Sequence, residues 1–111
     1  MLDEITFRNH ADHALEALKK SLFAAEDGGG FEVEEQNGVL NILFDQPPAK
    51  FVFTPNTPVR QIWISALSTS FKLDWSGAEE AFVLAKTGET LIPLTERLIR
   101  EHLNDDTVAL A

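Results

Sequence analysis

The sequence contains no cysteine. No disulfide can form, so nothing in the composition points to a secreted, disulfide-stabilised domain. Without a thiolate, the chain cannot ligate an iron–sulfur cluster through sulfur, relay a persulfide or carry out thiol redox chemistry. These absences exclude the classes of protein that depend on cysteine chemistry.

Basic residues are scarce, with 9 Lys and Arg against 18 Asp and Glu, which gives a formal net charge of −9. Nucleic acids and anionic membranes bind patches of Lys and Arg, so neither is expected as a partner. The charge favours basic protein surfaces or cations as partners, although an acidic excess can also serve solubility alone.

Long apolar runs are missing as well. No stretch reaches the roughly 18 residues of a membrane span, and the acidic start Met1-Leu2-Asp3-Glu4 is unlike a signal peptide. We therefore expect a soluble, cytoplasmic protein. The 111 residues are 44% hydrophobic, enough for the core of one domain. We expect this domain over residues 1–104, with a C-terminal tail over residues 105–111.

Motifs of catalysis are also absent. The sequence has no Gly-x-Ser-x-Gly, no His-Glu-x-x-His, no glycine-rich phosphate loop and no Cys–His pair. Ser65, Ser68 and Ser70 have no evident base nearby, and the adjacent Glu79 and Glu80 are typical of a solvated surface. We do not expect an enzyme.

Two amphipathic helices are expected, one toward each end of the chain. The first covers residues 3–24 and is followed by Gly28-Gly29-Gly30 as a flexible break. The second begins near Thr90, a residue type suited to an N-cap. Their core faces are made up of Phe7, Ala11, Ala14, Leu15, Leu18 and Leu22, and of Leu91, Leu94, Leu98 and His102.

Six strands are expected between the helices, over residues 31–35, 39–44, 50–54, 60–66, 71–75 and 82–85. Asn37-Gly38 is a strong signal for a hairpin turn, because both residues tolerate positive φ. Connections of hairpin length imply a mostly antiparallel sheet. The order of elements predicts an α+β two-layer sandwich, an antiparallel β-sheet of about six strands with the N- and C-terminal helices packed on one face.

The strand over residues 60–66 turns a tryptophan away from the core. Ile62 and Ile64 share one face of the pleat, whereas Gln61, Trp63 and Ser65 share the other. With both helices on the isoleucine face, the opposite face is bare and carries Trp63. A Trp among hydrogen-bonding side chains is typical of an interface hot spot, so this trio is predicted to bind a partner.

A second candidate surface is acidic and runs from the first helix to the first strand. Exposed carboxylates are hard oxygen ligands, suited to iron and other hard cations. They form no closed cage here, so binding would be weak, labile and unselective. The alternative is a plain solvated face that binds no metal. The candidate metal ligands are Glu4, Asp12, Glu16, Glu26, Glu32 and Glu34.

His10 and His13 form a third pattern, together with Glu16. Residues three apart are neighbours on a helix, so two imidazoles and a carboxylate could ligate Zn, Co, Ni or Fe(II). Nothing in the sequence orders these side chains, and ordinary surface histidines are the competing interpretation.

An ordered set of short motifs runs through the chain. Its members are Gly38-Val39-Leu40, Thr57-Pro58, Gln61-Ile62-Trp63-Ile64-Ser65, Asp74-Trp75, and Gly88 with Leu91 at the start of the last helix. In this order and spacing the set resembles the bacterial frataxins of the CyaY type, over about residues 5–103. The resemblance implies the frataxin fold. Frataxin tails can cover the groove between the helices, a place that Val108 and Leu110 would take here, and a disordered tail is the alternative because the tail starts with polar residues.

The resemblance also implies a function. Frataxins bind iron weakly and dock on the iron–sulfur cluster assembly machinery, a cysteine desulfurase and its scaffold protein, as iron chaperones or regulators. The implied cofactor is labile Fe2+ or Fe3+, and the implied state is a monomer. The family's acidic ridge corresponds to one continuous strip of Glu4, Asp12, Glu26, Glu32 and Glu34, and its docking surface to Gln61, Trp63 and Ser65.

The sequence departs from the family pattern in two places. Phe82 stands where the family has a second tryptophan, and Lys19-Lys20 and Phe23-Ala24 replace acids toward the end of the first helix. The ridge is thinned, with Lys20 placed to pair with Glu16, so docking through Trp63 is better supported than iron binding. A metal-independent interaction module and a weak ferroxidase or iron-storage protein stay open as alternatives.

Overall fold

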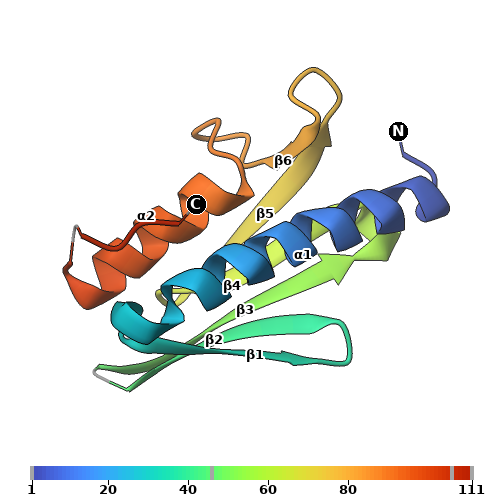
Figure 1. Ribbon diagram of the computed structural model, residues 1–111. Helices are drawn as coiled ribbons and strands as arrows, with labels where there is room; N and C mark the ends of the chain where they lie inside the picture. The colour runs from blue at the N-terminus through green and yellow to red at the C-terminus, as the bar shows by residue number, and fades with distance from the viewer. Residues whose placement is uncertain (1, 46, 106, 111) are drawn as a thin grey trace.

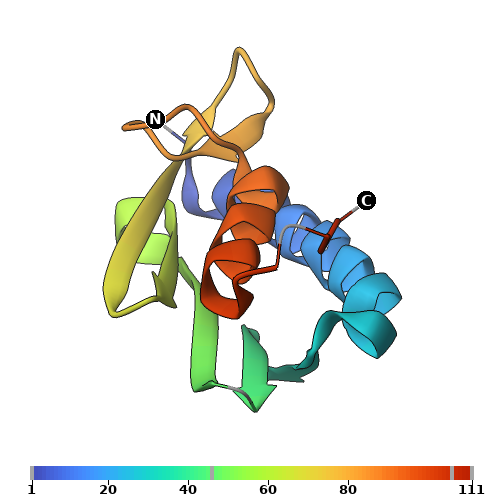
Figure 2. The same ribbon diagram turned by 90° about the vertical axis from the view of Figure 1, so that its left-hand side faces the viewer.

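Two helices and a six-stranded sheet make up the computed structural model, which describes residues 2–45, 47–105 and 107–110 and, for residues 27–29, the backbone alone. Figure 1 shows both helices on the same side of the sheet, and the turned view in Figure 2 agrees. The expected α+β sandwich is confirmed. Its elements are α1 (Glu4–Gly29), β1 (Phe31–Gln36), β2 (Val39–Asp45), β3 (Pro48–Asn56), η1 (Thr57–Val59), β4 (Gln61–Ala66), β5 (Thr69–Ser76), β6 (Ala81–Val83) and α2 (Leu91–Leu103).

The sheet is an antiparallel meander in which the strands lie in chain order from β1 to β6. The expected turn at Asn37 and Gly38 is confirmed, with φ of 53° and 81°. A second turn of the same kind joins β4 to β5, where Leu67 and Ser68 have φ of 53° and 59°. Positive φ at two successive residues matches the twist of a hairpin, so both turns fix the register of their strands.

The core lies between the sheet and the two helices. The expected core face of α1 is confirmed, because Phe7, Leu18 and Leu22 are fully buried. The ring of Phe7 meets that of Phe82 edge-on at a centroid distance of 5.8 Å. The helix begins where Asp3 accepts a hydrogen bond from the Thr6 amide at 2.7 Å, which is N-capping.

Several expected boundaries are wrong. The first helix continues through residues 25–29, and only Gly30, with φ of 75°, ends it as a left-handed C-cap. Glycine costs about 1 kcal/mol inside a helix. Ala25, which packs against the core, and Glu26, which accepts a hydrogen bond from the Val33 amide of β1, hold this last part of α1 in place against that preference. Pro48 starts β3, as proline is allowed to at the first residue of a strand. Arg60 precedes β4 in a left-handed conformation with φ of 56°.

The end of α2 is tied to the sheet by His102, as expected. The imidazole lies 4.4 Å from the ring of Phe44 and 5.8 Å from that of Phe51, centroid to centroid. Its Nε2 is 2.8 Å from the carbonyl oxygen of Pro47. Within the described residues, neither helix is both long and apolar enough to cross a membrane.

The C-terminal residues run back along α2 beside α1 (Figures 1 and 2). Val108 is 7% exposed and belongs to the core, and Leu110 packs against it. Arg100 Nε donates to the Val108 carbonyl at 2.7 Å, and the Leu110 amide donates to Glu96 at 2.8 Å. The division into a domain over residues 1–104 and a separate tail stays a prediction, which truncation tests.

Removal of the residues after Asn104 is expected to destabilise the protein. Truncation exposes the apolar surface beneath Val108 and removes two hydrogen bonds. The free energy of unfolding should fall by about 2 kcal/mol, which corresponds to about 10 °C in Tm. Val108→Ser should reproduce most of the change in thermal unfolding, whereas Ala109→Ser, at an exposed neighbour, should not. An unchanged Tm after truncation would contradict the packing.

Acid unfolding should reveal the ion pair between α2 and the loop before it. Glu89 accepts two hydrogen bonds from Arg97, each at 2.8 Å, which lower the pKa of the Glu89 carboxyl. The stabilisation is therefore present above the unfolded pKa and is lost as pH falls through the lowered folded pKa. Glu89→Gln should cost about 0.5 kcal/mol at pH 7 and nothing at low pH, since the pair is partly solvated. Glu101→Gln, at a longer pair with Arg97, is the control and should cost less stability than Glu89→Gln in denaturant titrations at pH 7.

Candidate functional site

The face of the sheet away from the helices carries Trp63. Alternation along β4 is confirmed, because Ile62 and Ile64 are buried at 0% and 1% exposure while Trp63 is 36% exposed. Ser65 is exposed on the same face as Trp63. The register places Thr54 on β3 and Lys72 on β5 directly beside the tryptophan. The large aromatic therefore lies in the middle of a sheet surface that neither α1 nor α2 covers.

A chain of polar contacts holds the indole in place. Trp63 Nε1 donates to Gln61 Oε1 at 2.8 Å, and Gln61 Nε2 donates to Asp74 Oδ1 at 3.0 Å. The ammonium of Lys72 lies 4.7 Å from the indole ring, within range of a cation–π interaction. A side chain that is already ordered loses less entropy when a partner binds. We call Gln61, Trp63, Ser65, Lys72 and Asp74 the Trp63 surface.

Two members of this surface, Lys72 and Asp74, were not predicted as functional residues. Both lie on β5, opposite Trp63 and Gln61 respectively. The signal that would have found them is the turn at Leu67 and Ser68, which sets this pairing. That turn contains neither Asn nor Gly, so its sequence does not predict a positive φ.

Three of the four predicted carboxylates on α1, Glu4, Asp12 and Glu16, are exposed, and two of these three are paired. Glu4 lies 3.8 Å from Arg8, a long contact between two solvated side chains. Glu16 lies 3.1 Å from Lys19, whereas Asp12 is exposed and has no hydrogen bond or ion pair within the described residues. Of these three, Asp12 is the carboxylate most available to a cation.

Lys19 bridges α1 and β1. Its ammonium lies 3.1 Å from Glu16 and 3.2 Å from Glu35, and these two carboxylates raise the pKa of Lys19. The expected pairing of Glu16 with Lys20 is wrong, because Lys19 is the lysine that turns toward β1. Lys20 is exposed and unpaired in the described part of the chain.

The remaining predicted ligands lie on or beside β1. Glu26 is half-buried and accepts a hydrogen bond from the Val33 amide at 2.7 Å. This contact covers a donor on the outer edge of β1, an edge strand that pairs only with β2. Glu32 and Glu34 are exposed and alternate with the core-facing Phe31 and Val33, so they point to the same side of the sheet as Trp63.

No three of the described His, Asp and Glu residues lie close enough together to hold a metal ion. The six predicted carboxylates are instead spread from the start of α1 to β1, each open to water or engaged in a local contact. Any cation bound here would keep most of its water and be held by few carboxylates. A metal role for this surface stays a prediction.

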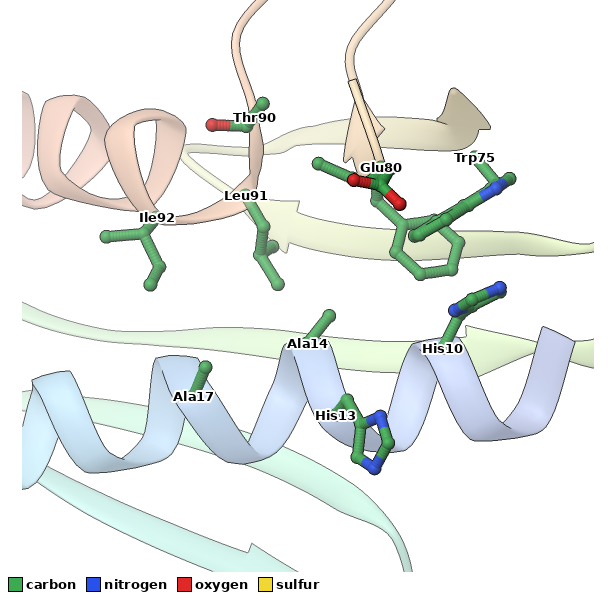
Figure 3. Close-up of a pocket in the computed structure, with 11 residues that line it drawn as sticks. His10, His13, Ala14, Ala17, Trp75, Glu80, Thr90, Leu91 and Ile92 are labelled. Atoms are coloured by element: carbon green, nitrogen blue, oxygen red, sulfur yellow. The ribbon is translucent and has the colours of Figure 1, made fainter. Parts of the chain in front are cut away.

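The two histidines of α1 lie in different surroundings. The ring of His10 stacks on that of Trp75 at 3.8 Å with an interplanar angle of 10°. His13 is exposed and turns away from His10 (Figure 3). The arrangement does not assemble the metal site considered for His10, His13 and Glu16.

Phe82, which departs from the family pattern, belongs to the core. It is 1% exposed and lies edge-on to Trp75 at 5.3 Å. It packs on the helix side of the sheet, with Phe7. The departure therefore leaves the Trp63 surface intact.

Comparisons with known proteins agree with this fold. A model of the frataxin-like domain matches residues 1–105. The protein named iron–sulfur cluster assembly protein CyaY from Pseudomonas putida strain W619 is 31% identical over 104 residues, which cover 94% of this chain and 92% of that one. The protein of the same name from Pseudomonas fluorescens strain Pf0-1 is 28% identical over 101 residues, with coverage of 91% and 89%.

A solved structure supports the fold alone. Frataxin from Psychromonas ingrahamii, described as a model to study stability modulation within the CyaY protein family, superposes with a TM-score of 0.79 at 14% identity and covers 93% of both chains. The family match spans nearly the whole domain, from α1 to the end of α2. The chain belongs to the frataxin-like family.

Proposed function

We propose that this chain acts in iron–sulfur cluster assembly by docking through the Trp63 surface on a cysteine desulfurase and its scaffold protein. The observation that carries the proposal is an ordered indole, 36% exposed, on the sheet face that no helix covers. Exposed aromatics held by polar neighbours are enriched among interface hot spots. The relatives named iron–sulfur cluster assembly protein support this choice of partner.

Charge supports docking on a basic partner. The chain carries a net charge of −9, and Glu32 and Glu34 face the same side of the sheet as Trp63. Opposite charges on two surfaces speed their encounter and set their relative orientation. We therefore assign the carboxylates of β1 to orientation and Trp63 to affinity.

Iron is the proposed cargo, bound weakly at the exposed carboxylates rather than held in a closed site. Oxygen ligands suit Fe2+ and Fe3+, and an open arrangement lets the ion leave again. The proposed ligands are Glu4, Asp12, Glu16, Glu26, Glu32 and Glu34. The role is delivery or regulation rather than catalysis by this chain.

A metal-independent interaction module is the second candidate function, and particular contacts favour it. Lys19 forms an ion pair with Glu16, and the Val33 amide donates a hydrogen bond to Glu26. Both contacts compete with a cation for the same oxygens. In this candidate the acidic residues serve docking and solubility alone.

Trp63→Ala is expected to weaken binding to the desulfurase–scaffold complex by about thirtyfold or more, which is the loss of about 2 kcal/mol typical of a hot spot. The fold should survive, because the side chain lies outside the core and its removal should cost about 1 kcal/mol or less. Calorimetry or interferometry with the purified complex measures the affinity, and thermal unfolding measures the stability.

The matched control is Phe23→Ala, which removes an aromatic that is 48% exposed on α1. It should leave the affinity unchanged. Equal losses in both variants would point to a general effect of exposed aromatics, and wild-type affinity in Trp63→Ala would remove the docking proposal.

Lys19→Gln is expected to strengthen iron binding by about threefold, since it frees Glu16 and Glu35 from a solvated ion pair. Anaerobic Fe2+ titration followed by amide resonances measures this, with broadening expected near residues 12–19 and 32–35. Lys20→Gln is the control, because it removes the same charge from an unpaired lysine and should have a smaller effect.

The outcomes separate the two candidate functions. An equal gain in both variants would mean that net charge alone governs binding and that the Lys19 pairs are irrelevant. Broadening outside residues 3–34 and Glu35 would contradict the assigned ligands. No specific broadening in wild type or in either variant would favour the metal-independent module.

A further inference from the structure

A groove of about 540 Å³ lies between α1 and the first turn of α2, on the helix side of the sheet and so away from Trp63 (Figure 3). Ala14 and Ala17 line it from α1 and Ile92 from α2. The stacked rings of His10 and Trp75 close one end. Its volume falls within the range of about 300 to 1,000 Å³ that small-molecule sites occupy.

The groove is the part of the space between the helices that the C-terminal residues leave open. Val108 and Leu110 are tied to Arg100 and Glu96, in the later turns of α2. Near the first turn of α2 the facing residues of α1 are alanines, whose side chains are too short to fill the gap. The walls of this opening are therefore mostly apolar and remain in contact with water.

Polar groups without partners surround these apolar walls. Within the described residues, the side chains of Glu80, Thr90 and His10 make no hydrogen bond or ion pair, although His10 is stacked on Trp75. Glu80 sits in the turn before β6 with φ of 51°, and its carboxylate lies over the groove (Figure 3). Apolar walls with a few converging polar groups are the usual composition of a ligand site.

The charge of the lining selects the class of ligand. No Lys or Arg lines the groove. With His counted as neutral, Glu80 is the one lining residue that carries a formal charge at pH 7. The aromatic rings of Trp75 and Phe82 lie at the same end. Trp75 is stacked on His10 and Phe82 is 1% exposed, so the attraction for an ammonium group comes from the Glu80 carboxylate.

The opposing influence is the N-terminus of α2, whose partial positive charge favours anions. Thr90 provides no side-chain cap, so the amides of the first turn lack that partner, although Pro93 has no amide hydrogen to offer. The N-terminus carries about half a unit charge, which is less than the full negative charge of Glu80, so the balance favours a cation. We propose that the groove binds a small organic cation with an apolar body, such as an alkylammonium or arylammonium. The ammonium pairs with Glu80, and the apolar body runs from there past Ala14 and Leu91 toward Ala17 and Ile92 (Figure 3).

Three probes that share a phenyl ring and differ in charge test the proposal on the full chain. They are benzylammonium, benzyl alcohol and benzoate, each titrated while amide resonances are followed. Benzylammonium should bind in the millimolar range, with shifts concentrated at residues 10–17, 75–82 and 90–92, and at least threefold more tightly than benzyl alcohol. Equal binding of the alcohol, or tighter binding of benzoate, would overturn the choice of a cation.

Variants separate this site from general attraction to an acidic protein. Glu80→Gln should weaken benzylammonium about threefold to fivefold, whereas Glu79→Gln, the same charge change at the preceding residue outside the groove, should not. Ala17→Leu should block the groove and abolish the shifts. Equal effects of both glutamine variants, or no shifts at these residues in wild type, would refute the proposal, and neither result depends on whether Ala17→Leu folds.

Discussion

The alternation of side chains along the strands is the constraint on which the rest of this structure depends. Each strand offers one apolar face to α1 and α2, and its other residues are directed to the bare side of the sheet. Two-residue turns at Asn37–Gly38 and at Leu67–Ser68 lock the pairing of their hairpins. A slip of one residue in β4 would bring Trp63 into the core and expel Ile62 and Ile64, so the core and the Trp63 surface are fixed by the same register.

On the acidic surface, contacts that stabilise the fold use carboxylates that are also proposed to bind a cation. Lys19 ties α1 to β1 through Glu16 and Glu35, and Glu26 covers the Val33 amide at the edge of the sheet. These contacts hold the end of a helix that contains glycines and protect an edge strand from pairing with another chain. A cation that takes Glu16 or Glu26 must break a contact that stabilises the fold. Weak and reversible binding is therefore what this geometry permits.

The order of the elements, the core face of α1 and the orientation of Trp63 could all be predicted from the sequence, because each rests on periodicity of apolar residues. The end of α1 could not, since packing against β1 overrides the helix-breaking preference of Gly28 and Gly29. Lys72 and Asp74 were missed because their place depends on a turn without Asn or Gly. Nor does any local pattern predict that His10, on α1, stacks on Trp75, which is far away in sequence and lies on β5. Contacts between distant elements are decided by packing, which periodicity alone does not encode.

Strand β5 contributes to both of the surfaces proposed to bind ligands. Lys72 and Asp74 belong to the Trp63 surface on one face, and Trp75 lines the groove on the other. The sheet itself separates them, so a cation in the groove cannot touch a protein docked on Trp63. Influence between the two would require β5 to move, and β5 is paired along its length with β4 and, at its end, with β6. A strand held on both sides by antiparallel ladders is among the least mobile parts of a fold. The arrangement therefore favours two binding events that proceed independently, one at the sheet face and one between the helices.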